Sequence, residues 1–297
     1  MRVAVLSDIH SNYHAFLACY EDALKHCAEC FIFLGDYVSD LAMTREVLDL
    51  VYEIRSKYPT VCLRGNREKY MLDCADGIAA FARGSKTGSL LYTYQQLRQK
   101  DLDFFRQLRI SDTVKLEGIT VEIAHAAMDN DRYYFDSKDG RAAHIFPKMK
   151  YDYLLTGHCH KQYAMRQDGK TILNPGSVGV PHGGSRSAKY ALLDIADGSL
   201  NCKLREVAYD IEAAIRSQFD SGLVRCAGFW AIGILHDLIT GQERTMALLA
   251  CVEQMGDPQD EDVWRRAATY LGMKLTEQDI LAFYQATLET AQATEVL

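Results

Sequence analysis

Aspartate, asparagine and histidine residues stand directly after five short apolar runs of this sequence. They are Asp8 and His10, Asp36, Asn66, His125, and His158 and His160. Short apolar runs of this kind are typical of buried strands, and ligand sites gather at the carboxyl ends of strands in α/β sheets. Two carboxylates, four imidazoles and an amide are donors that hard-to-borderline divalent ions select. The pattern therefore predicts a metal site at one edge of a sheet.

Each of these residues has an ordinary structural explanation when it is taken alone. Gly35-Asp36 and Gly65-Asn66 are common turn pairs, and a single histidine such as His125 is more often hydrogen-bonded inside a core than bound to a metal. These explanations do not account for the whole set at successive strand ends.

The elements that must position these residues alternate between strands and helices at first. Strands are predicted over residues 3–6, 31–34, 61–63, 113–116, 119–124, 153–156, 171–173 and 190–194. Helices are predicted over residues 13–27, 41–56 and near 86–108. The βαβαβ opening implies parallel strands, whereas hairpin turns at Glu117-Gly118 and Asp168-Gly169 imply antiparallel pairs later. We therefore expect an α/β (α+β) fold of two packed mixed sheets flanked by helices.

The last third of the chain has a different pattern. Helices are predicted over residues 210–218, 223–240, 243–255, 260–272 and 276–291. We place a domain boundary near residue 207, which gives a core domain over 1–207 and a helical extension over 208–297 that docks on it. The segment GFWAIGILHDLIT at 228–240 is apolar enough for a buried helix. The extension could cap the site or join copies of the chain into a homo-oligomer, and the sequence leaves both open.

Composition limits the partners. Of the 297 residues, 48% are hydrophobic and 25% charged, which is ordinary for a soluble globular protein. The net charge of −7 argues against binding to extended nucleic acid. No apolar stretch approaches the ~18 residues that span a bilayer, and Asp8 comes too early for a signal peptide. Nine scattered cysteines favour reduced thiols. We expect a cytoplasmic protein that does not act at a membrane.

Five short motifs in a fixed order give the sequence a family resemblance. They are SDIHSN, LGDYV, RGNRE, IAHA and TGHCH. The chain resembles the calcineurin-like metallophosphoesterases, whose blocks are D-x-H, G-D, G-N-[HDC]-[DE], a lone His and G-H-x-H. NPGSVGVPHGG followed by AKYALLDI is similar to the closing loop and strand of its small bacterial phosphodiesterase/phosphatase branch. The resemblance covers about residues 1–206 and implies a β-sandwich flanked by helices.

The resemblance also implies a dinuclear metal centre. Asp8, His10 and His160 would hold the first ion, and Asn66, His125 and His158 the second. Asp36 would bridge the two ions. Two ions ~3.5–4 Å apart can clamp a phosphoryl group and activate a shared water, so the implied reaction is in-line attack of a metal-bridging hydroxide on a phosphoester. The donor set suits Mn²⁺, Fe²⁺, Zn²⁺ or Ni²⁺, with Mn²⁺ favoured for assay. Asp36, Asn66, Arg67 and His125 are the expected catalytic residues.

Arg67 departs from the family, which often has a histidine there to protonate the leaving group. Arginine has no proton to give at neutral pH, but it can bind a phosphate oxygen and stabilise negative charge. This favours leaving groups that need little protonation. In the alternative, Arg67 points to solvent and pairs with Glu68 or another acid. We expect Gly65, two residues earlier, to let the chain turn sharply.

Three further residues are predicted to contact the substrate. They are His14, Arg132 and His182. In the alternative interpretation His14 only packs at a helix start, His182 is solvated, and the segment MDNDRYYFD around Arg132 is a surface loop. In that segment Tyr133 or Tyr134 could stack on a base.

The expected function is metal-dependent hydrolysis of a small phosphodiester, nucleotide or phosphorylated metabolite. A second interpretation is a catalytically weak member of the fold that acts as an interaction scaffold, and the complete set of ligands argues against it. A protein serine/threonine phosphatase is a third, which the small core and the absence of a histidine at position 67 disfavour.

Overall fold

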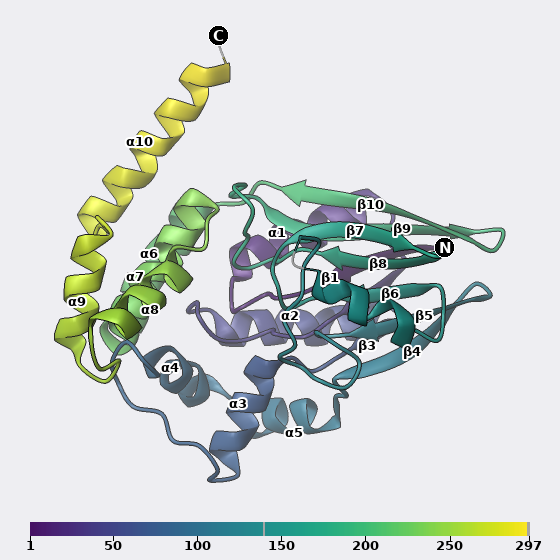
Figure 1. Cartoon of the computed structure of the whole chain (residues 1–297), viewed down its shortest axis with the longest axis horizontal. Coiled ribbons are helices and arrows are strands. Elements are labelled where there is room, and N and C mark those ends of the chain that lie inside the picture. The colour runs from purple at the N-terminus through teal and green to yellow at the C-terminus, as the bar shows by residue number, and fades with distance from the viewer. Residues whose placement is uncertain (139, 296–297) are drawn as a thin grey trace.

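Two five-stranded mixed sheets form the centre of the protein (Figure 1). The computed structural model describes residues 1–138 and 140–295, with the backbone alone for 291–295. The strands are β1 (Arg2–Leu6), β2 (Cys30–Phe33), β3 (Thr60–Cys62), β4 (Ser111–Leu116), β5 (Ile119–Ala124), β6 (Tyr153–Thr156), β7 (Gln162–Gln167), β8 (Lys170–Pro175), β9 (Ala188–Ala196) and β10 (Ser199–Val207). One sheet has the order β10-β9-β1-β2-β3 and the other β4-β5-β6-β8-β7. This confirms the predicted fold class.

Parallel strands lie at the centre of each sheet. β1, β2 and β3 run parallel, as do β5, β6 and β8, while antiparallel strands complete the edges. The side chains of β1 alternate as the period of a strand requires. Val3 and Val5 face the cluster between the two sheets, whereas Ala4 and Leu6 face the helices outside. The carboxyl ends of the parallel strands are therefore fixed by burial on both faces.

The helices of the core domain cover the outer face of the first sheet and the part of the molecule that lies at the bottom of Figure 1. They are α1 (Tyr13–Lys25), α2 (Thr44–Lys57), α3 (Asn66–Ala75), α4 (Gly88–Gln96) and α5 (Gln99–Gln107), with short 3-10 helices at Arg141–His144 and Phe146–Lys148. Phe16 of α1 and Val51 of α2 pack in one buried cluster with Phe31 and Phe33 of β2. The single helical stretch predicted near 86–108 is two helices, since Leu97 and Arg98 between them have extended backbone.

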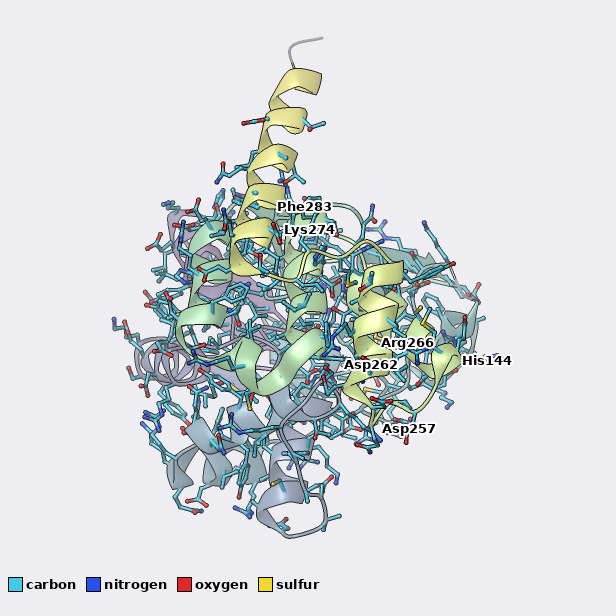
Figure 2. The ribbon with its side chains drawn as sticks, turned by 90° about the vertical axis from the view of Figure 1, so that its left-hand side faces the viewer. His144, Asp257, Asp262, Arg266, Lys274 and Phe283 are labelled. Atoms are coloured by element: carbon cyan, nitrogen blue, oxygen red, sulfur yellow. The ribbon has the colours of Figure 1, made fainter. Side chains whose placement is uncertain are left out.

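The chain after β10 is helical, and Figure 1 shows these helices on the side of the sheets opposite the N-terminus. They are α6 (Ile211–Asp220), α7 (Leu223–Thr240), α8 (Arg244–Met255), α9 (Glu261–Tyr270) and α10 (Glu277–Glu295). Figure 2 views this side and shows α10 rising from the rest. At its base, the ring of Phe283 lies 5.4 Å from that of His236, whose Nε2 accepts the Lys274 N–H at 3.0 Å. His236 is thus a packed histidine.

One helix, α7, passes the length and composition test for a membrane span, contrary to the sequence expectation. Its 18 residues have a mean hydropathy of 1.4, and 67% of the segment is buried inside the protein. A buried, apolar helix of this length is also what the core of a soluble protein requires. Ile232, Leu235 and Leu238 of α7 are buried in a cluster with Ile211 and Ile215 of α6.

Candidate metal centre

The loops that follow β1, β2, β3, β5 and β6 bring the seven predicted ligands to one edge of the two sheets. Five of these ligands have left-handed backbone: Asp8 (φ 55°), His10 (φ 50°), Asp36 (φ 54°), His158 (φ 67°) and His160 (φ 61°). This conformation costs about 1–3 kcal/mol per non-glycine residue and persists only where the surroundings enforce it, mostly at functional sites. Ser11, Ser39 and Asp40, which neighbour these ligands in sequence, are also left-handed, so strained backbone is frequent in the loops of the site.

The side chains form two groups that could each hold an ion. Asp8, His10 and His160 make one group and Asp36, His125 and His158 the other, and within each group the ligand atoms lie within 4.8 Å of one another. In the first group His10 Nε2 lies 3.0 Å from His160 Nε2. In the second, His125 Nε2 lies 3.2 Å from Asn66 Oδ1, so the amide joins this group.

Asp36 lies between the two groups. Its Oδ2 atom is 3.9 Å from His10 Nε2 and 3.6 Å from His125 Nε2. Its other oxygen accepts the backbone N–H of Arg67 at 2.8 Å. A carboxylate placed between two sets of imidazoles can bridge two cations and offset their repulsion.

Acceptor atoms lie behind the far nitrogen of three histidines, and two of these contacts have the geometry of a hydrogen bond. His125 Nδ1 lies 2.8 Å from the Leu34 carbonyl oxygen, and His160 Nδ1 lies 3.0 Å from that of Val180. His10 Nδ1 lies 3.0 Å from Asp40 Oδ2, within ion-pair distance but without hydrogen-bond geometry. A proton on Nδ1 leaves the Nε2 lone pair free, which is how metal-binding histidines are oriented. All three Nε2 atoms then face the two groups.

The electrostatics of the site fit bound cations. Burial lowers the pKa of His158 to about 4 and that of His160 well below its usual range, so both imidazoles are neutral and can donate to a metal. Burial raises the pKa of Asp8. Burial would also raise the pKa of Asp36, but His125, His10 and Arg67 outweigh it and lower that pKa. Burial would lower the pKa of His125, but the nearby carboxylates Asp36 and Asp8 outweigh it and raise that pKa, so positive charge is favoured at this site. Bound cations would supply that charge for two buried carboxylates. The residues therefore fit a dinuclear centre.

A buried glutamate fixes the loops that carry Asp36 and Asn66. Both oxygens of Glu68 accept backbone N–H groups: Tyr37 at 2.8 Å and Val38 at 3.3 Å on one, Asp36 at 3.0 Å and Gly65 at 2.8 Å on the other. Glu68 has no solvent exposure. It ties the start of α3 to the loop after β2.

Gly65 serves a close approach and not a sharp turn, so that expectation was wrong. Its φ of −94° suits any residue. A Cβ there, however, would lie 2.1 Å from Asp36 Oδ1 and 2.6 Å from the Asp36 nitrogen. The glycine therefore leaves room for the carboxylate between the two groups.

A cavity of about 420 Å³ opens over the two groups. Its lining consists of His10, Asp36, Asn66, Arg67, Tyr134, His158, Cys159, His160, His182, Glu243 and Met246. A cavity of this size holds a small molecule. Glu243 and Met246 belong to the helical extension, so the extension forms part of the wall.

The predicted substrate contacts divide into two sets. Arg67 and His182 line the cavity, and His182 Nδ1 lies 3.1 Å from Glu243 Oε1. His14 and Arg132 are absent from the lining formed by the described residues. His14 lies on α1, and the Arg132 guanidinium lies 4.7 Å from the centre of the Tyr70 ring. Of the two tyrosines considered for stacking, Tyr134 lines this cavity and Tyr133 another hollow.

Sequence reasoning missed Cys159, Glu243 and Met246 of the cavity lining. It also missed Asp40, which pairs with Arg67, and Trp230, which donates to Asp40. Glu68 was considered only as a partner of Arg67. Glu68 stands three residues after the N-cap Gly65 and accepts its backbone N–H, as the glutamate of a capping box does, and this spacing could have indicated the role of Glu68. Burial raises the pKa of Cys159 to about 12, so this thiol is not a nucleophile at neutral pH.

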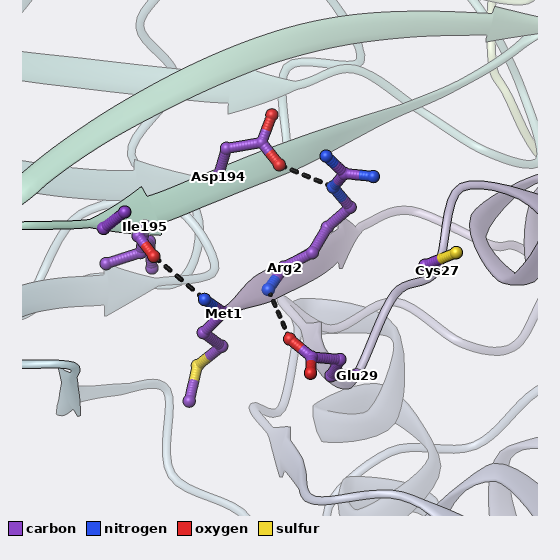
Figure 3. A pocket seen from close by; sticks show the side chains of 7 residues that line it. Met1, Arg2, Cys27, Glu29, Asp194 and Ile195 are labelled. Carbon is purple, nitrogen blue, oxygen red and sulfur yellow. Dashed lines mark hydrogen bonds and ion pairs between the residues drawn. The ribbon is translucent and has the colours of Figure 1, made fainter.

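A second hollow, of about 520 Å³, lies at the amino end of β1 (Figure 3). It is lined by Met1, Arg2, Cys27, Glu29, Asp194, Ile195 and Ala196. Figure 3 shows that its polar groups are already paired. The Arg2 guanidinium donates to Asp194, the Arg2 backbone N–H donates to Glu29, and the Met1 ammonium donates to the Ile195 carbonyl. The hollow is larger than the cavity over the metal groups, but it lies at the opposite end of β1 from Asp8.

Known proteins resemble this chain over most of its length. The calcineurin-like phosphoesterase superfamily domain matches residues 1–198. An uncharacterized protein of Methanocaldococcus jannaschii is 26% identical over 240 residues, which make up 71% of this chain and 89% of that protein. Among solved structures, a metallophosphoesterase from Sphaerobacter thermophilus has a TM-score of 0.66 at 22% identity, covering 81% of this chain and 100% of its own. A hypothetical protein from Pyrococcus horikoshii has a TM-score of 0.68 at 21% identity, covering 82% and 99%.

The two solved structures share the fold, and the family match spans more than half of the 297 residues. The match includes all five motifs and both groups of candidate ligands. The resemblance predicted from the sequence is confirmed: the chain belongs to the calcineurin-like phosphoesterase superfamily.

Proposed function

We propose that this protein is a metal-dependent phosphoesterase that hydrolyses a small phosphodiester, nucleotide or phosphorylated metabolite. The observation that carries the proposal is the pair of His/Asp groups on either side of Asp36, open to a cavity lined by Arg67. Two divalent ions held by these groups would polarise a phosphoryl group and supply an activated water. Mn²⁺, Fe²⁺, Zn²⁺ and Ni²⁺ all suit this donor set, and we propose Mn²⁺ for the first assays.

Arg67 supports binding of a phosphoryl oxygen. Its guanidinium lines the cavity and pairs with Asp40 at 2.9 Å. Its Nε atom is buried and has no hydrogen-bond partner among the described residues. An unpaired buried donor carries a cost unless a ligand satisfies it, and an arginine offers several N–H groups in a fixed plane. Arg67 thus pairs with an acid, as the alternative interpretation expected, and its place in the cavity lining supports the proposed contact with phosphate.

The proposed substrate class rests on the arginine at position 67, which is not a proton donor, and on apolar side chains in the cavity lining. Arginine gives no proton to a leaving group at neutral pH, so esters of good leaving groups are favoured, and we propose diesters or nucleotides over simple monoesters. Tyr134 and Met246 supply apolar surface for the organic part of such a substrate.

The nine cysteines are all free thiols, which supports the proposal of a cytoplasmic location.

The test of the proposed function is hydrolysis of bis-p-nitrophenyl phosphate and p-nitrophenyl phosphate. The protein is stripped of metal with a chelator and then supplied with Mn²⁺. Binding of the ion is measured separately by calorimetric titration. Turnover that depends on the ion, and is faster with the diester, is the expected result. Binding of ions without turnover of either compound would favour the interaction scaffold.

Replacing Arg67 by alanine is expected to reduce kcat by about 100-fold, the cost of removing one donor that stabilises transition-state charge. Metal affinity should be unchanged, because the Arg67 side chain is not among the metal-binding groups. The matched control is Arg109→Ala, since the Arg109 side chain is 74% exposed. Steady-state kinetics and calorimetry on both variants provide the measurement. Equal kcat values in the two variants would place Arg67 outside the reaction.

A further inference from the structure

Asp40 is a buried carboxylate at the centre of four contacts. It is 2% exposed. One oxygen, Oδ2, lies 2.9 Å from an Arg67 terminal nitrogen and 3.0 Å from His10 Nδ1. The other, Oδ1, accepts the indole N–H of Trp230 at 2.8 Å. The backbone N–H of Asp40 donates to Ser89 Oγ at 3.0 Å. Asp40 therefore links a metal-binding histidine, the cavity arginine and a residue of the extension.

The backbone that carries Asp40 is strained. Asp40 has a φ of 69° and Ser39 a φ of 83°, both in the left-handed region. Such a conformation persists only when its surroundings enforce it. The contacts of Trp230 and Ser89 provide that enforcement from outside the loop.

Trp230 is itself held in place by the way α7 docks on the core. Gly228 interrupts the helix with φ 53° and ψ −132°, two residues before Trp230. At this kink the Phe229 N–H donates to Ser85 Oγ at 2.9 Å, and the Gly84 N–H donates to the Cys226 carbonyl at 2.9 Å. Figure 1 shows α7 beside α4, the helix that carries Ser89. The docking of α7 thus fixes where the indole points.

The extension also packs on the loops of the metal centre. Leu41 is 1% exposed and Val180 is 2% exposed, and both are buried in the apolar cluster of α6, α7 and α10. Leu41 follows Asp40 directly. The Val180 carbonyl oxygen is the hydrogen-bond partner of His160 Nδ1. The apolar core of the extension is therefore continuous with the layer of residues behind the candidate ligands.

We propose that the helical extension positions Arg67 over the metal centre through the hydrogen bond from Trp230 to Asp40. Trp230 and Asp40 are then positioning residues for phosphoester hydrolysis, and this inference rests on the proposed function. Without the indole N–H, Asp40 Oδ1 is left buried and unpaired, a state that favours reorientation of the carboxylate. Because Arg67 is paired to the same carboxylate, its guanidinium moves with it, and the site binds an oxyanion less well.

The first experiment is a double-mutant cycle with Trp230→Phe and Arg67→Ala in the Mn²⁺-loaded protein. Trp230→Phe should weaken binding of tungstate, a phosphate-like oxyanion, by about fivefold, and lower kcat by a similar factor, within the range measured for coupled neighbours. In the Arg67→Ala background the same substitution should change neither quantity by more than the measurement error. Equal effects of Trp230→Phe in both backgrounds would overturn the proposal, since they would show a general loss of structure.

The matched control is Trp264→Phe. Trp264 lies on α9 of the extension, is fully buried, and donates its indole N–H to the Pro258 carbonyl at 2.9 Å, away from Asp40. This variant loses the same donor and should leave tungstate affinity unchanged. Loss of oxyanion affinity in Trp264→Phe as large as in Trp230→Phe would contradict a specific role for Trp230. Thermal unfolding of each variant, and a calorimetric metal titration, separate positioning from unfolding.

A second readout does not depend on turnover. The chain has two tryptophans, so protein labelled with 5-fluorotryptophan gives two ¹⁹F resonances. The resonance that disappears in Trp230→Phe belongs to Trp230. It should shift when tungstate binds and lose this response in Arg67→Ala, while the Trp264 resonance stays in place. If the protein hydrolyses no phosphoester, the proposed function fails, and this shift still tests the coupling. If the Trp230 resonance does not shift when tungstate binds, the proposed coupling between Trp230 and Arg67 is overturned.

Discussion

Replacing His158 by alanine is expected to lower metal-dependent phosphoesterase activity by at least ~10³-fold, since catalysis of this kind depends on the complete pair of ions. His158 belongs to the group with Asp36, His125 and Asn66, and the carboxylate, imidazole and amide that remain are a poorer site without it. Burial keeps its pKa at about 4, so at neutral pH the side chain is ready to donate to an ion. Even an outer partner of a metal-binding histidine is worth about 10–100-fold in affinity.

The matched control for this substitution is His144→Ala, because His144 is an exposed histidine on a surface 3-10 helix (Figure 2). Metal content is measured by mass spectrometry after dialysis, and turnover of bis-p-nitrophenyl phosphate is measured at saturating Mn²⁺. His158→Ala should retain about one fewer ion per chain than His144→Ala. Full occupancy and full activity in His158→Ala would rule out the second group as a metal site.

The fold was predictable wherever burial imposed a periodic pattern. β1, β2, β5 and β6 are buried strands, and the sequence predicts each to within about one residue. β10 was missed because its side chains alternate between exposed and half-buried, and polar residues such as Asn201 and Lys203 fill the exposed positions. β7 was implied only by the Asp168-Gly169 turn, which the structure confirms. An edge strand with one solvated face has little apolar signal to read.

The candidate ligands were predictable for a different reason. Their residue types are unusual at strand ends, and the topology of parallel strands brings those ends together. Asp40 and Trp230 were not predictable, because their hydrogen bond joins residues 190 positions apart and neither type is unusual where it stands. Glu243 reaches His182 in the same way, from the other side of the domain boundary placed near residue 207. Contacts between the extension and the core follow from packing, which no local pattern encodes.

Replacing Glu68 by glutamine is expected to destabilise the protein by about 2–4 kcal/mol, because each buried donor left without an acceptor costs about 1–3 kcal/mol. The four backbone N–H groups that Glu68 accepts come from two loops, those after β2 and β3. A carboxamide keeps one acceptor oxygen and turns an NH₂ group toward the N–H groups that the other oxygen satisfied. Those donors lie in buried hydrogen bonds, so each one left without an acceptor lowers the stability of the fold.

The same substitution should weaken metal binding, which separates it from an ordinary loss of stability. Asp36 is anchored through its own backbone N–H to Glu68 and lies between the two metal groups, so a loosened loop displaces the carboxylate that both groups share. The matched control is Glu53→Gln, since the Glu53 side chain is 50% exposed and pairs only on the helix surface with Lys57. Urea unfolding and calorimetric titration of Mn²⁺ are measured on both variants. If Glu68→Gln unfolds and binds ions as Glu53→Gln does, the loops are held by their own packing, and the glutamate is not what keeps the two metal groups in register.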